Sequence, residues 1–148
     1  MRRFAWVAVA VLITGCLGVR QHSGPGMNDE VRDGTLAFTV TAIHLGVPET
    51  GHRTAQGVFV VVNLMVKNDG PTPRAVYCQD QMLTDFSGKN YEHAFNLDSP
   101  NDRTNIEAGK QVLVTCAFDV PKAMLPASIT LRASQFSHGV RVALMAGG

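Results

Sequence analysis

The side chains in this sequence with the greatest capacity for chemistry are five histidines, three cysteines and the serine that precedes His138. The histidines are scattered, at His22, His44, His52, His93 and His138. No two of them have the spacing that places two imidazoles on one metal ion. We therefore expect surface histidines and no metal or other cofactor, although a cluster formed only by folding stays open.

Two other arrangements are candidates for catalysis or cation binding. Ser137 precedes His138, but adjacency alone does not make a nucleophile and a base, and the chain has no Gly-x-Ser-x-Gly motif. Asp98, Asn101 and Asp102 could bind Ca²⁺ in a loop, yet the regular spacing of a calcium loop is absent. Turn capping accounts better for these three residues. We expect no enzymatic activity.

The N-terminus has the pattern of an export signal. Met1, Arg2 and Arg3 precede ten residues without a charge, which end at Ile13. Such a run is typical of a secretory signal and is too short for a membrane-spanning helix, which needs about 20 apolar residues. Residues 12–16, Leu-Ile-Thr-Gly-Cys, resemble the lipobox of bacterial lipoproteins, in which the cysteine thiol takes a diacylglyceryl group and becomes the first mature residue.

This resemblance implies a signal peptide at residues 1–15 and a lipid on Cys16. Acyl chains would hold the protein at a membrane, because each buried methylene contributes about 0.8 kcal/mol. Removal of residues 1–15, which include Arg2 and Arg3, takes the formal net charge from +1 to −1. A chain with so little positive charge lacks the means to neutralise phosphates, so we expect no nucleic-acid partner.

With Cys16 assigned to lipid, Cys78 and Cys116 remain as an even pair in an oxidising compartment. Both are in phase with apolar neighbours on predicted strands. A disulfide is the favoured interpretation, and two separate buried thiols are the alternative, because a sequence cannot give the distance between two residues. No Cys-x-x-Cys motif suggests a redox pair.

The rest of the chain is organised as a linker and one β domain. Residues 16–34 hold several glycines without an amphipathic period, so we expect a flexible tether there. From residue 35 to residue 148, short alternating blocks are separated by turn signals, which predicts an all-β, immunoglobulin-like antiparallel β-sandwich of seven or eight strands. The expected strands are residues 35–43, 57–67, 74–79, 81–86, 90–94, 111–119, 129–133 and 140–144.

Three connections carry predictions of their own. Residues 87–89 predict a hairpin loop with Gly88 at positive φ. Residues 96–110 are polar and predict a loop, and residues 122–125, which lie between Pro121 and Pro126, predict one helical turn.

The strand at residues 57–67 is apolar on both faces. One face consists of alternating aliphatic residues and must belong to the core. The other face carries Phe59, Val61 and Met65, which makes it a candidate docking surface for a protein of the envelope or of a host. Coverage by the tether, by the loop at residues 96–110 or by the edge of the other layer is the favoured interpretation of this face, and the docking surface is the alternative.

Several motifs together resemble a family of extracytoplasmic bacterial domains of unknown function. This family is frequent in actinobacterial and mycobacterial lipoproteins and is related in fold to the mycobacterial immunoprotective extracellular antigen. The resemblance covers residues 31–144, and its marks are the segments 80–85, 87–88, 105–109, 118–121 and 134–144, together with Tyr91. It implies an immunoglobulin-like sandwich on the outer side of the membrane, with no agreed activity.

We therefore expect a lipid-anchored protein on the extracytoplasmic face of the cell membrane, acting as a non-enzymatic binding module. The alternative is a carrier or sensor that binds a small molecule or a metal in a cleft of the sandwich. The sequence does not indicate the partner or the oligomeric state.

Overall fold

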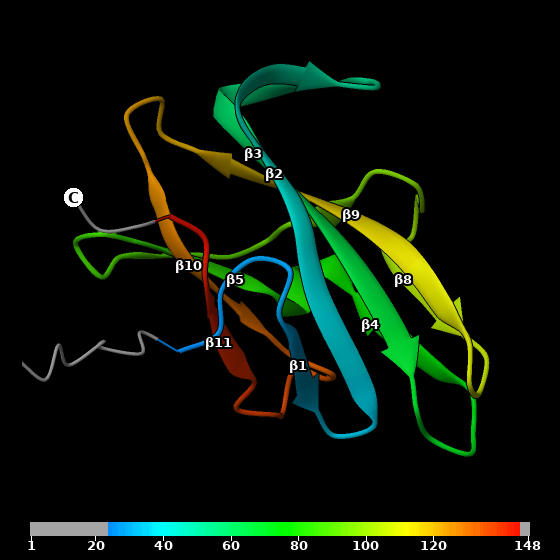
Figure 1. Cartoon of the computed structure of the whole chain (residues 1–148). Coiled ribbons are helices and arrows are strands. Elements are labelled where there is room, and N and C mark those ends of the chain that lie inside the picture. The colour runs from blue at the N-terminus through cyan, green and yellow to red at the C-terminus, as the bar shows by residue number, and fades with distance from the viewer. Residues whose placement is uncertain (1–23, 146–148) are drawn as a thin grey trace, which may run out of the picture.

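The computed structural model describes residues 24–145, and these form an all-β sandwich (Figure 1). Eleven strands and one short 3₁₀ helix are present in this part of the chain, without an α-helix. The predicted signal peptide, Cys16 and His22 lie outside the described residues. No helix within residues 24–145 is long and apolar enough to cross a membrane.

The larger sheet has five strands in the order β1-β2-β3-β9-β7. All neighbouring pairs are antiparallel. Its members are β1 (Glu30–Asp33), β2 (Leu36–Thr50), β3 (Arg53–Asn68), β9 (Gln111–Val120) and β7 (Phe95–Asn96).

The second sheet has four antiparallel strands in the order β11-β10-β5-β6. These are β11 (Val140–Ala143), β10 (Pro126–Leu131), β5 (Met82–Asp85) and β6 (Asn90–Tyr91). A two-stranded sheet of β4 (Arg74–Tyr77) and β8 (Arg103–Ile106) completes the sandwich, and the 3₁₀ helix η1 (Cys78–Asp80) follows β4.

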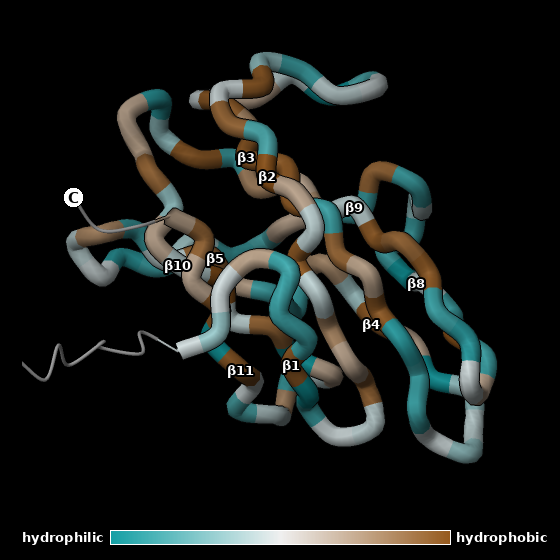
Figure 2. The backbone as a smooth tube through the Cα atoms, in the orientation of Figure 1, coloured by the Kyte–Doolittle hydropathy of each residue, from teal (hydrophilic) through white to brown (hydrophobic). Residues whose placement is uncertain are grey.

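The core forms where the inward faces of these sheets meet. The predicted alternation of β3 is confirmed, because Val60, Val62, Leu64 and Val66 are all buried. Along β3 and β9, brown hydrophobic residues alternate with paler or teal ones, whereas the turn after β3 is teal to white (Figure 2). The other strands add buried side chains to the same cluster, among them Phe38, Leu83, Val114, Phe118, Ile129, Leu131 and Val142.

Three strands were not predicted. β1 lies in the segment 16–34 that was predicted as a tether, and Val31 enters the core through pairing of β1 with β2. The folded domain therefore begins before residue 35. β7 and β8 lie in and beside the predicted loop at residues 96–110, where Ile106 is fully buried. The predicted helical turn at residues 122–125 is a tight turn, in which the Met124 N–H donates to the Pro121 carbonyl at 3.0 Å.

β2 and β3 extend beyond the sandwich as a long hairpin, seen at the top of Figure 1. The register between them shifts three times, between Val40 and Ala42, between His44 and Val47, and between Val47 and Glu49. Such irregularities bend a strand and increase its twist. The hairpin therefore turns away from the sheet, and its tip at residues 50–53 lies near the loop at residues 95–102.

Candidate functional site beside the disulfide

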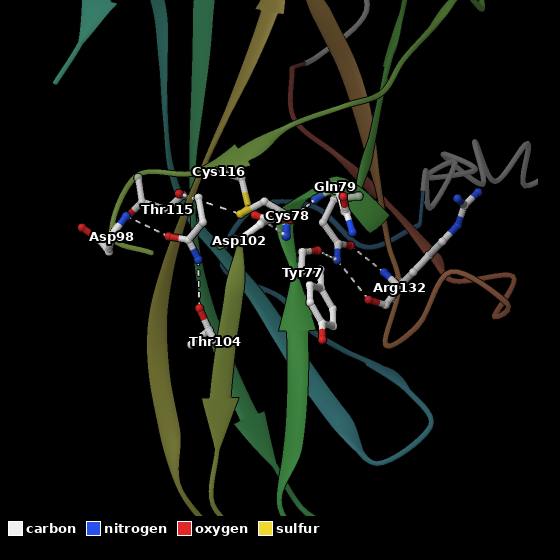
Figure 3. Close-up of a disulfide and its surroundings, with 11 residues drawn as sticks. Tyr77, Cys78, Gln79, Asp98, Asp102, Thr104, Thr115, Cys116 and Arg132 are labelled. Carbon is white, nitrogen blue, oxygen red and sulfur yellow. Dashed lines mark hydrogen bonds between the residues drawn. A yellow bond between two sulfur atoms is a disulfide. The ribbon is translucent and has the colours of Figure 1, made fainter. Parts of the chain in front are cut away.

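Cys78 of η1 and Cys116 of β9 form a disulfide, as predicted (Figure 3). Their Cα atoms are 5.4 Å apart, and both residues are fully buried. The bond attaches η1, which directly follows β4, to β9 of the larger sheet. The two cysteines therefore do not persist as separate thiols.

Asp102 fixes the loop that lies over this disulfide. Its carboxylate accepts the backbone N–H groups of Cys78 at 3.2 Å and of Gln79 at 2.9 Å, which are visible beside the sulfur atoms in Figure 3. Asp102 has a φ of 61°, a backbone conformation that Asp tolerates better than most residues. The carboxylate thus joins the segment before β8 to the first turn of η1.

Asn96 anchors the other end of the same loop. Its buried side chain donates to the Thr104 hydroxyl at 2.9 Å and accepts the Asp98 N–H at 2.8 Å. The Leu97 N–H donates to the Thr115 carbonyl on β9 at 3.0 Å. Residues 96–102 are therefore held at both ends by hydrogen bonds and lie next to a covalent crosslink.

A groove of about 440 Å³ separates this loop from the tip of the β2–β3 hairpin. Its wall on the hairpin side is Thr50 to Arg53, and the opposite wall is built by residues 95–100 and Asp102. The Arg53 guanidinium stacks over the Phe95 ring at 4.1 Å from the ring centre. Phe95 in turn packs edge-on against Phe59, with ring centres 5.4 Å apart.

The electrostatics of the groove are defined by Arg53. Within residues 24–145, no carboxylate lies within 4.0 Å of its guanidinium. Arg53 is exposed, so its N–H donors face solvent and the groove. The groove therefore combines an aromatic floor, an unpaired cation and the exposed carboxylate of Asp98 on the opposite wall.

A second groove, of about 420 Å³, lies between β4 and the loop after β10. Phe136 projects there with 87% of its surface exposed. Burial raises the pKa of Asp80 at the edge of this groove, the charge of Asp102 raises it further, and Arg132 opposes both effects. The side chain of Gln81 holds the loop after β10 in place. Its NH₂ group donates to the carbonyls of Tyr77 and Arg132, and its carbonyl oxygen accepts the Arg132 N–H.

A family model described as "Domain of unknown function (DUF4352)" matches residues 25–141. The chain belongs to this family. No curated protein matches the chain.

Solved structures share the fold of this DUF4352 domain. The yjhA protein of Bacillus subtilis is 12% identical with a TM-score of 0.61, over 82% of this chain and 100% of that one. MPT63, described as a secreted protein of Mycobacterium tuberculosis, is 14% identical with a TM-score of 0.58, over 82% and 98%. A β-sandwich protein of Clostridium difficile is 12% identical with a TM-score of 0.52, over 80% and 89%. The expected resemblance in fold to a mycobacterial secreted antigen is confirmed.

The predicted docking face of the DUF4352 domain is largely buried. Phe59 is 2% exposed and Val61 is 6% exposed, and Met65 is half-buried. Phe59 and Val61 form a small second core with Ala117, against which Val47, Ala55 and Phe95 pack. A free docking surface at Phe59 and Val61 is therefore excluded, and this face is covered, which is the interpretation that the sequence favoured. The covering segments are the bent hairpin and β7.

The polar residues considered for chemistry have structural partners. Asn101 accepts the Ser99 hydroxyl at 2.8 Å and the Arg103 N–H at 3.2 Å, so Asn101 and Asp102 both cap turns. The Ser137 hydroxyl lies within hydrogen-bonding distance of the Asp33 carboxylate and the Ser134 carbonyl. It therefore ties the loop after β10 to β1. Residues 24–145 contain no group of three His, Cys, Asp or Glu side chains placed to hold a metal ion.

Sequence reasoning missed the groove beside Arg53. Arg53 and Phe95 are 42 positions apart in the sequence, and only the bend of the hairpin brings them together.

Proposed function

We propose that this protein is a lipid-anchored, non-catalytic interaction module on the extracytoplasmic face of a bacterial cell membrane. Its binding site is the groove between the hairpin tip and residues 95–102, and its partner is a peptide segment of an envelope or host protein. An extended segment with a carboxylate fits this groove best, because Arg53 offers unpaired N–H donors above an aromatic floor.

The observation that carries this proposal is the stacking of Arg53 on Phe95. The stacking fixes the guanidinium at the groove wall, so little side-chain entropy is lost when a carboxylate binds it. Asp102, Asn96 and the disulfide hold the facing loop in place. A pre-organised groove with an aromatic residue and an arginine has the features of binding hot spots.

Two observations support the location. The Leu12 to Cys16 pattern follows a short apolar run, as in bacterial lipoproteins. In addition, one protein with the same fold, MPT63, is described as secreted.

Site-specific crosslinking in intact cells tests the binding site. A photoreactive phenylalanine analogue replaces Leu97, which lines the groove, and in the control it replaces Leu113, which is exposed on β9. We expect an adduct from position 97 that Arg53→Gln reduces strongly. Equal labelling from position 113, or labelling at 97 that does not depend on Arg53, would contradict the proposal.

The volume of the groove favours one alternative, a carrier of a small molecule, since ligand pockets begin at about 300 Å³. Native mass spectrometry of protein purified without denaturation separates the two functions. A retained mass that Arg53→Gln removes would assign the groove to a small ligand instead of a peptide.

A further inference from the structure

Two half-exposed hydrophobic side chains lie together at one end of the four-stranded sheet. Phe86 follows β5 and Leu125 precedes β10, and each is 50% exposed. Both line one shallow depression, of about 250 Å³, together with Met124. Met124 is buried beneath them, so the pair forms the outer layer of a continuous apolar surface.

This surface lies at the end of the molecule where the chain enters the fold. Asp85, next to Phe86, pairs with Pro126, next to Leu125. Ser128 on the same strand pairs with Ala143, whose N–H donates to the Pro25 carbonyl at 2.9 Å. In Figure 1 the entering chain, the tip of the β5–β6 hairpin and the loop before β10 all lie on the left side.

The distance to the predicted lipid is short. Gly24 is eight positions after Cys16, and eight residues span at most about 29 Å when fully extended. A lipid on Cys16 would therefore hold this end of the sandwich close to the bilayer. The tip of the β2–β3 hairpin, whose residues Thr50 to Arg53 form one wall of the groove, lies at the upper right of Figure 1.

Two exposed lysines flank the apolar pair. Lys89 ends the turn that contains Phe86, and Lys122 belongs to the loop that contains Leu125. The Asp85 carboxylate, which lines the same depression, accepts the N–H groups of Ser87 and Lys89 and the Tyr91 hydroxyl at 2.9 to 3.0 Å. These hydrogen bonds lower the pKa of Asp85, so it stays ionised at neutral pH and offsets one of the two lysine charges. Two further exposed acidic residues lie three positions from these lysines along the chain: Glu92 after Lys89, and Asp119, which accepts the Gln56 and Gly57 N–H groups, before Lys122.

We propose that Phe86, Leu125, Lys89 and Lys122 form a membrane-contact surface for a bilayer that contains anionic lipid. The two apolar side chains enter the headgroup region while the lysines bind lipid phosphates, as in other interfacial segments. This inference rests on the proposed anchoring at Cys16 and extends it. The anchor keeps the domain at the membrane, and this surface orients it with the groove facing outward.

Tryptophan placed on the surface tests the contact. The lipidated protein that begins at Cys16 contains no Trp, because the one Trp of the sequence, Trp6, lies in the predicted signal peptide. Variants with Cys16→Ser, which can keep residues 1–15, also carry Trp6→Phe. Phe86→Trp or Leu125→Trp is added to the full chain, bound to vesicles of phosphatidylcholine and phosphatidylglycerol that contain brominated acyl chains. We expect quenching and a blue shift at both positions. The control is Leu113→Trp, which is similarly exposed, at 52%, and lies about 23 Å before the end of β9. It should stay unquenched.

A second experiment removes the anchor. With Cys16→Ser, the double variant Phe86→Ser and Leu125→Ser should bind anionic vesicles about tenfold more weakly than its parent, because two partly buried side chains are lost. Lys89→Gln with Lys122→Gln should reduce binding to anionic vesicles and leave binding to neutral ones unchanged.

The outcomes separate the two proposals. Anchored protein that floats with vesicles while the indole introduced at position 86 or 125 stays unquenched would keep the anchor and overturn the contact surface. In another outcome, the wild-type chain does not float with vesicles, but the Trp at position 86 or 125 of the Cys16→Ser chain is quenched at high lipid concentration. This result would support the contact surface and contradict the lipid anchor. Concentration-dependent dimerisation abolished by Phe86→Ser would assign the surface to a second copy of the chain and overturn the membrane contact.

Discussion

Phe59 shows how a single residue decides between a surface and a core. It packs against Phe95 and lies among Val61, Ala117 and the hairpin residues that cover this side of β3. The sequence pattern leaves both options open, because an apolar second face of a strand fits either a partner or a covering segment.

Phe59→Asp should therefore destabilise the domain by about 3 kcal/mol or more, because an unpaired charge would be placed in an apolar site. Thermal and urea unfolding measure the loss. Leu113→Asp is the matched control, because Leu113 is 52% exposed and should tolerate the charge. Equal, small effects of both substitutions would show that Phe59 is not buried.

Two aspartates should respond to pH in opposite directions. Burial, with the Asp102 charge, raises the pKa of Asp80, so its ionised form is disfavoured in the folded state and stability is lost as pH rises above about 4. The Ser87 hydrogen bond leads the contacts that lower the pKa of Asp85, partly offset by burial, so its contribution is present at neutral pH and is lost in acid.

Asp80→Asn should thus raise the melting temperature at pH 7 and leave it unchanged near pH 3. Asp85→Asn should lower it at pH 7, with a difference that shrinks in acid. Melting curves at both pH values measure the two effects. The same sign for the two variants at pH 7 would contradict the assigned environments.

At the scale of elements, the disulfide is the connection that holds β4 and η1 to the larger sheet. It closes a loop of 38 residues. In the chain-entropy model such a crosslink stabilises the fold by about 4 kcal/mol through its effect on the unfolded chain. Cys78→Ala with Cys116→Ala should cost about this amount in urea unfolding. A loss below about 1 kcal/mol would show that other contacts already hold this region.

Gly57 permits the close approach of β3 and β9 where the hairpin leaves the sheet. A Cβ atom at this position would lie 2.0 Å from the Val120 carbonyl oxygen. The N–H groups of Gln56 and Gly57 both donate to the Asp119 carboxylate, at 2.9 and 3.1 Å. These hydrogen bonds hold β3 against the end of β9.

Gly57→Ala should cost about 2 kcal/mol or more, because the backbone must shift to make room. Gly26→Ala serves as a control, because its Cβ would meet no atom closer than 3.8 Å and its φ is not positive. Equal melting temperatures for the two variants would contradict the close approach.

The elements were predictable where one strand face carries several apolar residues, as in β3 and β9. β1 and β8 escaped prediction because each has one buried apolar side chain, Val31 or Ile106, among polar residues. β1 forms along the edge of the longer β2, and β8 forms by pairing with the equally short β4, so both strands depend on tertiary information. The disulfide was predictable from residue types and strand phase. The groove was not, because it depends on three register shifts in the hairpin.

At the scale of the whole molecule, the proposals assign different tasks to two sides of the sandwich. One side carries Phe86, Leu125 and two lysines close to the predicted lipid, and the tip of the β2–β3 hairpin, which forms one wall of the groove with Arg53, extends on another side (Figure 1). A domain held in this way would present its groove to molecules outside the membrane. This arrangement depends on the lipid that we propose at Cys16.

The intact mass of the protein isolated from bacterial membranes tests the anchored module most directly, with Cys16→Ser as its partner variant. We predict a product that begins at Cys16 and carries the added mass of acyl chains, and a Cys16→Ser product that leaves the detergent phase or keeps residues 1–15. A wild-type product without lipid, or a Cys16→Ser product that stays fully membrane-bound after loss of residues 1–15, would contradict the account.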